Sequence, residues 1–170
     1  MSNQPLRELL QRESIQQRCE SVYETFGMLT LTVSKENLLA LCHLLKHDST
    51  LQFNFLSDIC GVDHYPQRPR FETVYHLYSI PFKYRLRIKC RFELDELPPS
   101  VVPVWQTANW HEREAYDMYG IAFVGHPDLR RIYMWEGYDG YPMRKDYPLR
   151  GYADHYNPFG EARSERTEGA

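Results

Sequence analysis

The sequence has few cysteines, and no two of them have the spacing of a metal or cluster site. The four lie far apart along the 170 residues, as Cys19, Cys42, Cys60 and Cys90. Zinc sites and iron–sulfur clusters usually draw on close pairs such as CxxC, so neither kind of site is indicated. Free cysteine is among the most frequently buried residue types, and we therefore expect four reduced, buried thiols.

Long apolar segments are also missing. The longest nearly apolar run, Leu38 to Leu45, contains His43 and is far shorter than a membrane-spanning helix. The first residues, MSNQPLRELLQRES, are polar and charged and lack the apolar stretch of a secretory signal. The sequence therefore predicts a cytoplasmic protein that reaches a membrane only through partners.

Positive charge is not in excess, and phosphate-binding motifs are absent. The formal net charge is -3, whereas proteins that bind nucleic acid or anionic membranes usually carry a clear basic excess. The sequence has no GxGxxG, no P-loop and no nucleophile elbow. Nothing in it therefore indicates a nucleotide, flavin or nucleic-acid site.

Periodic patterns are present through the first 124 residues. They predict helices at Ser14–Phe26 (ending at Gly27), Ser34–Lys46 and Asn109–Gly120, and strands at Met28–Val33, Leu51–Val62, Phe71–Ile80 and Tyr84–Leu94. In the last strand apolar residues alternate with a row of four bases, Arg85, Arg87, Lys89 and Arg91. Short loops favour antiparallel pairing. The predicted class is α+β, a largely antiparallel sheet with helices packed on one side.

After residue 124 the periodicity ends. Between Gly125 and Gly160 there are five glycines, four prolines and eight aromatic residues. So many breakers cannot make a core, and so many aromatics are not typical of a plain linker. We expect a core domain at 1–124, an extended interface strap at 125–160 that lies on other surfaces, and a disordered tail at 161–170.

Two histidine patterns suggest metal binding but fit it poorly. His43 and His47 have helical i, i+4 spacing, yet they lie opposite the predicted apolar stripe, so exposed histidines are expected. His111-Glu112 begins like the zinc-protease HExxH motif, but Ala115 replaces the second histidine.

The helix at Asn109–Gly120 carries three carboxylates, Glu112, Glu114 and Asp117, which could indicate acid–base chemistry. Arg113 stands four residues before Asp117, so an ion-paired structural helix accounts equally well for the spacing. Asn109 followed by Glu112 also resembles a capping box. The next stretch, Tyr119–Val124, superficially resembles an RNA-binding strand but lacks its base and two of its aromatics.

Three longer blocks resemble one known family. The first runs from Glu112 to Phe123 as EREAYDMYGIAF, the second from Gly125 to Ile132 as GHPDLRRI, and the third from Gly140 to Pro148 as GYPMRKDYP. Together they resemble the family of the 30 kDa subunit, also called the C subunit, of proton-pumping NADH:quinone oxidoreductase, respiratory complex I. The Gly61-Val62-Asp63 turn also looks familial, and the resemblance covers the chain from about Met28 to Pro148.

This resemblance implies a non-catalytic structural subunit of the peripheral arm. Its neighbours would be a quinone-site subunit that resembles a hydrogenase large chain and a small iron–sulfur subunit. NADH, FMN, iron–sulfur clusters and quinone would be bound elsewhere in the complex, on the cytoplasmic side of the membrane. The residues implied in the family signature and subunit interface are Glu112, Arg113, Glu114, Asp117, Gly120, Gly125, His126, Pro127, Arg130, Arg131, Tyr141, Pro142, Arg144, Lys145 and Asp146.

Two other functions remain open at this point. One is a homologous subunit of a membrane-bound hydrogenase or of another dehydrogenase that does not use NADH. The other is a free-standing module that binds RNA or protein.

Overall fold

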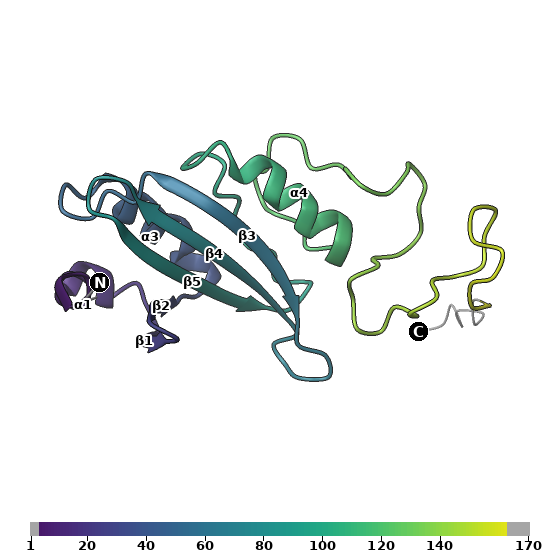
Figure 1. Cartoon of the computed structure of the whole chain (residues 1–170), viewed down its shortest axis with the longest axis horizontal. Helices are drawn as coiled ribbons and strands as arrows, with labels where there is room; N and C mark the ends of the chain where they lie inside the picture. Colours follow the sequence, from purple (N-terminus) through teal and green to yellow (C-terminus); the bar gives the residue numbers. More distant parts are fainter. Residues whose placement is uncertain (1–3, 163–170) are drawn as a thin grey trace.

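The computed structural model describes residues 4–162 and contains one five-stranded sheet with helices on one face (Figure 1). The strand order is β1-β2-β5-β4-β3, and every neighbouring pair is antiparallel except β2 with β5. The strands are β1 (Ser21–Thr25), β2 (Met28–Thr32), β3 (Phe55–Asp63), β4 (Phe71–Ser79) and β5 (Tyr84–Phe92). The helices are α1 (Gln4–Leu10), α2 (Glu13–Gln16), α3 (Lys35–His47) and α4 (Ala108–Tyr119). The predicted α+β class is confirmed.

Apolar and basic residues alternate along β5, and the apolar ones mark the buried face of the sheet. Its apolar residues from Leu86 to Phe92 are all at most 1% exposed and join Leu38, Leu41 and Leu45 of α3 in the core. Figure 1 shows α3 behind the sheet in this view and no helix in front of it. The row of bases on β5 therefore lies on the face that no helix covers.

The predicted helix at Ser14–Phe26 is wrong. Its first part forms the single turn α2, and its second part forms β1, which pairs with β2. Phe26 and Gly27 have φ angles of 51° and 73°, the conformation of a two-residue hairpin turn. Strand pairing with β2 therefore overrides the helical pattern, and Gly27 is a turn residue, not a helix C-cap.

Helix α4 has the predicted end but not the predicted start. The N-cap residue is Thr107, not Asn109, and the side chain of Glu112 bonds outside the helix, so no capping box forms. Gly120 at the C-cap is left-handed, with φ 73°, and its N–H donates to the carbonyl of Tyr116.

The prediction of four buried thiols is wrong in part. Cys42 and Cys90 are buried as predicted, but Cys19 is half-buried and Cys60 is exposed on β3. Cys60 follows the buried Ile59, and successive residues of a strand face opposite sides of the sheet.

The other two sequence features have different outcomes. His43 and His47 are exposed on α3, opposite its buried leucines, as predicted. The Gly61–Asp63 block belongs to the end of β3 and is not a turn.

Residues 125–162, which we call the C-terminal segment, contain no helix or strand. Figure 1 shows this segment passing α4 and then extending away from the sheet, so that its far part and α1 lie at opposite ends of the molecule. The greater part of the predicted tail, residues 163–170, lies outside the described residues. Within residues 4–162, no helix is long and apolar enough to cross a membrane.

Candidate functional site

Three charged residues of α4 are buried although the helix lies at the edge of the sheet. Glu112, Arg113 and Asp117 are at most 6% exposed, and α4 packs against β3 through Ala115 and its neighbours. A buried charge is stable only when hydrogen bonds or opposite charges satisfy it. The partners of these three side chains therefore define the candidate site.

Asp117 holds the beginning of the C-terminal segment. One carboxylate oxygen accepts from Arg131 at 2.7 Å, and the other accepts from the backbone N–H groups of Ile132, Tyr133 and Met134 at 2.9, 2.6 and 3.0 Å. Burial raises the pKa of Asp117, but these hydrogen bonds outweigh it and hold the pKa below its usual value. The ionised carboxylate thus fixes four successive residues to α4.

Arg113 supports the same contact from the next turn of the helix. It donates to the carbonyl oxygens of Arg130 and Arg131 at 3.1 and 3.4 Å, and its guanidinium lies 4.7 Å from the centre of the Trp110 ring. The expected pairing of Arg113 with Asp117 is wrong, since Asp117 is neutralised by Arg131. Residues four apart face the same side of the helix, but here the two side chains bind different parts of the C-terminal segment.

Glu112 faces the opposite way, toward the loop before α4. Its carboxylate accepts from the hydroxyl of Ser100 and the N–H of Val101, both at 2.7 Å. Burial raises the pKa of Glu112 to about 7, although these two hydrogen bonds oppose the shift. Glu112 therefore fastens the entry of α4, where the sequence suggested paired catalytic carboxylates.

His126 lies beside Glu112 with a fully buried side chain, Nε2 being 3.9 Å from the carboxylate. Its Nδ1 accepts from the N–H of Asp128 at 3.0 Å, and its Nε2 lies 3.2 Å from the carbonyl oxygen of Asn109. A carbonyl only accepts, so the proton sits on Nε2 and the ring is neutral. His126 thus contacts two backbone groups and joins the first turn of the C-terminal segment to α4.

A second anchor joins the sheet to residues 145 and 146, in the middle of the C-terminal segment. Arg70 donates to both oxygens of Asp63, at 2.9 and 2.8 Å, and to both oxygens of Asp146, at 2.9 and 2.8 Å. Asp63 also accepts from the N–H of Lys145 at 2.9 Å. Burial raises the pKa of Asp63, but the hydrogen bonds from Arg70 and the backbone lower it to about 2.

The third anchor is a stack at the end of α4. Arg144 donates from Nε to the carbonyl of Tyr119 at 2.6 Å, and its guanidinium lies 4.2 Å from the centre of the Tyr141 ring. A Cβ at Gly120 would lie 2.4 Å from Nη2 of Arg144 and 2.7 Å from the Tyr141 ring. Only glycine allows this close approach.

The structure thus brings together nine of the fifteen residues of the implied set, with Asp63 and with Arg70, which sequence reasoning missed. We call this group the anchoring cluster: Asp63, Arg70, Glu112, Arg113, Asp117, Gly120, His126, Arg131, Tyr141, Arg144 and Asp146. Lys145 contributes only its backbone N–H to the cluster. Glu114, Gly125, Pro127 and Arg130 are exposed, and Pro142 is half-buried.

Little in the sequence indicated that Arg70 belongs to the site. Its partners are seven and 76 positions away, and it follows a proline-rich loop that looked like a plain connection. Asp63 was noticed only as part of a familial block. Both residues matter because the fold places the end of β3 beside residues 145 and 146.

The arrangement is suited to holding a segment in place. Every charge of the cluster is taken up by a side chain, a backbone group or an aromatic ring. Among residues 4–162, no group of three or more His, Cys, Asp or Glu side chains could hold a metal ion.

The C-terminal segment exposes several large apolar side chains. Its fractional exposures include 61% for Tyr133, 102% for Leu149, 73% for Tyr156 and 88% for Phe159. The contacts to the core are thus made by charged and backbone groups, while large apolar side chains of the same segment lie in solvent beside polar ones.

Comparison with protein families gives a match over residues 31–153 to the family described as respiratory-chain NADH dehydrogenase, 30 Kd subunit. The C-2 subunit of the NADH-quinone oxidoreductase of Rhizobium etli is 62% identical over 141 residues, which are 83% of this chain and 75% of that protein. The corresponding C subunit of Burkholderia mallei is 45% identical over 150 residues, with the same two shares.

A solved structure has a similar fold. It is a chain of the membrane-bound sulfane sulfur reductase, an archaeal respiratory membrane complex, with a TM-score of 0.70 over 86% of this chain and 85% of that one. The sequence identity is 22%, so this likeness concerns the fold alone.

Proposed function

Because this chain belongs to the family of the 30 kDa subunit of respiratory-chain NADH dehydrogenase, we propose that it works as a non-catalytic structural subunit of that complex. In this role it acts within the peripheral arm of an NADH:quinone oxidoreductase. Its activity is that of the complex, and the isolated chain is not itself a dehydrogenase.

The observation that carries this proposal is the orientation of the C-terminal segment. The anchoring cluster fixes residues 126–146 to the core through ion pairs and backbone hydrogen bonds. The same segment exposes Tyr133, Leu149 and Phe159 to solvent. Large apolar side chains exposed together mark surfaces that partners cover, and aromatic residues supply much of the binding energy of interfaces. The segment is therefore the surface through which the chain meets its neighbours.

This proposal extends to named kinds of partner. The C-terminal segment would lie on the quinone-site subunit, which resembles a hydrogenase large chain, and would reach the small iron–sulfur subunit. NADH, FMN, iron–sulfur clusters and quinone would be bound by other subunits. The chain would lie on the cytoplasmic side and reach the membrane only through the complex.

The test is a variant that removes the exposed apolar groups without touching the anchoring cluster. In the full chain, Tyr133→Ser, Leu149→Ser and Phe159→Ser are combined. We expect unchanged far-UV circular dichroism and melting, but loss of the chain from the complex purified from native membranes. The control is Phe26→Ser, which removes a fully exposed ring from the β1–β2 turn.

The result that would overturn the proposal is normal recovery of the triple variant with the complex. Loss of both variants to the same degree would also count against it, since the C-terminal segment would then have no special part in assembly.

A further inference from the structure

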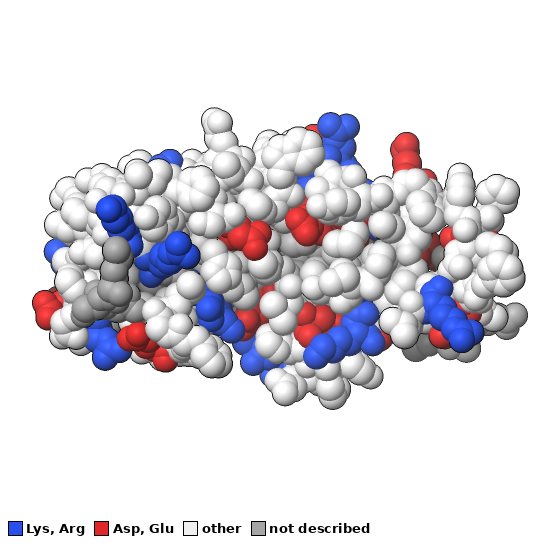
Figure 2. Space-filling view, in the orientation of Figure 1, with Lys and Arg blue, Asp and Glu red and all other residues white. Residues whose placement is uncertain are grey.

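The face of the sheet without helices carries a row of bases. Arg85, Arg87, Lys89 and Arg91 project from β5 on this side, opposite the buried apolar residues of the same strand. Figure 2 shows the molecule from this side, with several patches of Lys and Arg atoms, and some acidic ones, over the part where the strands lie in Figure 1. This is a local basic surface on a chain whose net charge is -3.

Among residues 4–162, only two of these four bases have an oxygen partner. Lys89 pairs with Glu72 at 2.9 Å, and Arg91 donates to the carbonyl of Pro69 at 2.8 Å. Arg85 and Arg87 form no ion pair with any of residues 4–162. A basic pair without a counter-charge is therefore concentrated at one end of β5.

The two arginines have weak partners in place of carboxylates. The guanidinium of Arg87 donates to the sulfur of Met28 at 3.5 Å, while its Nε is buried without a hydrogen-bond partner. Arg85 lies 5.6 Å from the centre of the Tyr78 ring. A thioether and a ring face are poor substitutes for an anion, and guanidinium groups bind carboxylates with two parallel hydrogen bonds where one is offered.

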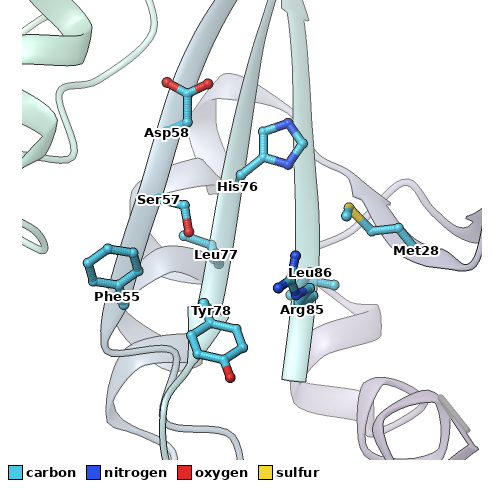
Figure 3. A pocket seen from close by; sticks show the side chains of 9 residues that line it. All are labelled: Met28, Phe55, Ser57, Asp58, His76, Leu77, Tyr78, Arg85 and Leu86. Atoms are coloured by element: carbon cyan, nitrogen blue, oxygen red, sulfur yellow. The ribbon is translucent and has the colours of Figure 1, made fainter. Parts of the chain in front are cut away.

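A groove of about 400 Å³ opens beside Arg85 on the same face. Figure 3 shows Phe55 from β3 and Tyr78 from β4 on one side of Arg85, and Met28 on the other. Phe55 pairs with Tyr78 across the sheet and is 46% exposed. The groove thus offers an apolar recess next to unneutralised positive charge.

The remaining titratable groups of the groove do not supply the missing charge. Burial, with the nearby charge of Arg87, lowers the pKa of His76. Asp58 lines the far end of the groove, where Figure 3 shows its carboxylate directed away from Arg85, and it lies 3.3 Å from His111 of α4. Residues 4–162 therefore supply no anion that matches Arg85 and Arg87.

We propose that this face of the sheet docks an acidic protein segment of a neighbouring subunit of the complex. An apolar side chain of that segment enters the groove between Phe55 and Tyr78, and flanking Asp or Glu side chains bind Arg85 and Arg87. The inference rests on the proposed function, because it takes the partner from the same assembly. It adds a second interface on the face opposite α3, made of different residues from the C-terminal segment.

A protein occupant fits better than a nucleic acid or a membrane surface. The groove walls are largely apolar and aromatic, and only two of the four bases have neither a counter-charge nor an oxygen acceptor among residues 4–162. Phosphate-rich ligands are met by many free bases along a surface. Acidic segments with an embedded apolar residue match both the recess and the pair of charges.

The experiment places a photo-cross-linker in the groove of the assembled complex. Phe55 is replaced by p-benzoylphenylalanine, the complex is purified and illuminated, and the linked peptide is identified by mass spectrometry. We expect one linked site on another subunit, in a segment with Asp or Glu around an apolar residue. The combined change Arg85→Glu and Arg87→Glu should lower the yield by about tenfold or more, because like charges then face each other.

The matched control makes the same change of charge elsewhere. Arg18→Glu combined with Arg68→Glu alters one half-buried and one exposed arginine away from the groove and should leave the cross-link yield unchanged. Circular dichroism of each full chain checks that the fold is retained.

Three results would overturn the inference: no cross-link from position 55 in an assembled complex, a cross-link to lipid or to a segment without acidic residues, or a yield that the Arg85 and Arg87 changes leave unaltered. Failure of the proposed function looks different, since the unmodified chain would then be missing from the purified complex.

Discussion

The carboxylate of Asp117 and the guanidinium of Arg131 lie 2.7 Å apart, and this ion pair closes the C-terminal segment onto α4. Asp117 is fully buried, while the side chain of Arg131 is 19% exposed. The pair is therefore shielded from solvent on the helix side and open on the other. Three backbone N–H groups from the segment complete the hydrogen bonding of the same carboxylate.

Replacing Asp117 with Ala should release the C-terminal segment. The change leaves Arg131 without its counter-charge and three N–H groups without an acceptor. Breaking a buried ion pair typically lowers the free energy of unfolding by about 3 to 5 kcal/mol. We expect a lower melting temperature and faster proteolysis between residues 130 and 150, measured by mass spectrometry of the fragments. The control is Asp128→Ala, which removes an exposed pair with Arg130. Equal protease resistance in the two variants would contradict the anchoring role.

Gly120→Ala and Gly27→Ala form a matched pair of substitutions. Both glycines have φ +73°, so an added Cβ strains the backbone equally, by roughly 1 to 2 kcal/mol. At Gly27 the Cβ meets nothing within 4 Å, whereas at Gly120 it collides with Arg144 and Tyr141. We expect chemical denaturation to show a larger loss of stability for Gly120→Ala, together with displacement of residues 141–144. A loss of stability no greater than that of Gly27→Ala would show that Arg144 and Tyr141 move aside easily.

Glu112 should make stability depend on pH near neutrality. Burial raises its pKa from 4.5 to about 7, so the folded state keeps a proton that the unfolded state releases. The contribution of Glu112 to the free energy of unfolding is therefore most favourable below pH 4.5. It decreases as the pH rises to about 7, by about 3 kcal/mol in all. Glu112→Gln should flatten this dependence between about pH 5 and 8 in urea denaturation.

Glu114→Gln serves as the control for this pH dependence, since Glu114 is exposed two positions away on the same helix. Glu114→Gln should leave the slope of the free energy of unfolding against pH unchanged. If the free energy of unfolding has the same pH dependence in the unmodified chain and in Glu112→Gln, the buried carboxyl does not take up a proton between about pH 5 and 8.

Truncation after Val124 tests the division between core and C-terminal segment. The sheet and α3 retain their core, so the far-UV circular dichroism should persist. Asp117 and Arg113 lose their partners in the segment, so the melting temperature should fall below that of the full chain, and the truncated chain should fail to join the complex. Normal assembly of the truncated chain, or its failure to fold, would require the boundary at residue 124 to be moved.

Local sequence patterns were sufficient for much of the fold. The alternation of Leu86, Ile88 and Cys90 with bases predicts β5 and its two faces, and the leucine spacing predicts α3, because both patterns depend on which neighbours along the chain share a face. The helix predicted at Ser14–Phe26 failed since its second half finds hydrogen bonds in β2, a partner that local propensity cannot see. The family, too, was evident from three contiguous blocks of residues.

The site was decided by tertiary structure. From sequence alone, Arg113 stood in helical register with Asp117, and Arg70 stood in a loop with no visible partner. In the folded chain, Asp117 pairs with Arg131, and Arg113 donates to two backbone carbonyls. Arg70 donates to carboxylates that are seven and 76 residues away. Sequence determines which charges are present and which face of an element they share. Only the packing of α4 against β3 determines which of these charges are buried. A buried charge is stable only with a hydrogen-bond or ion-pair partner, and the fold determines which partners are near enough.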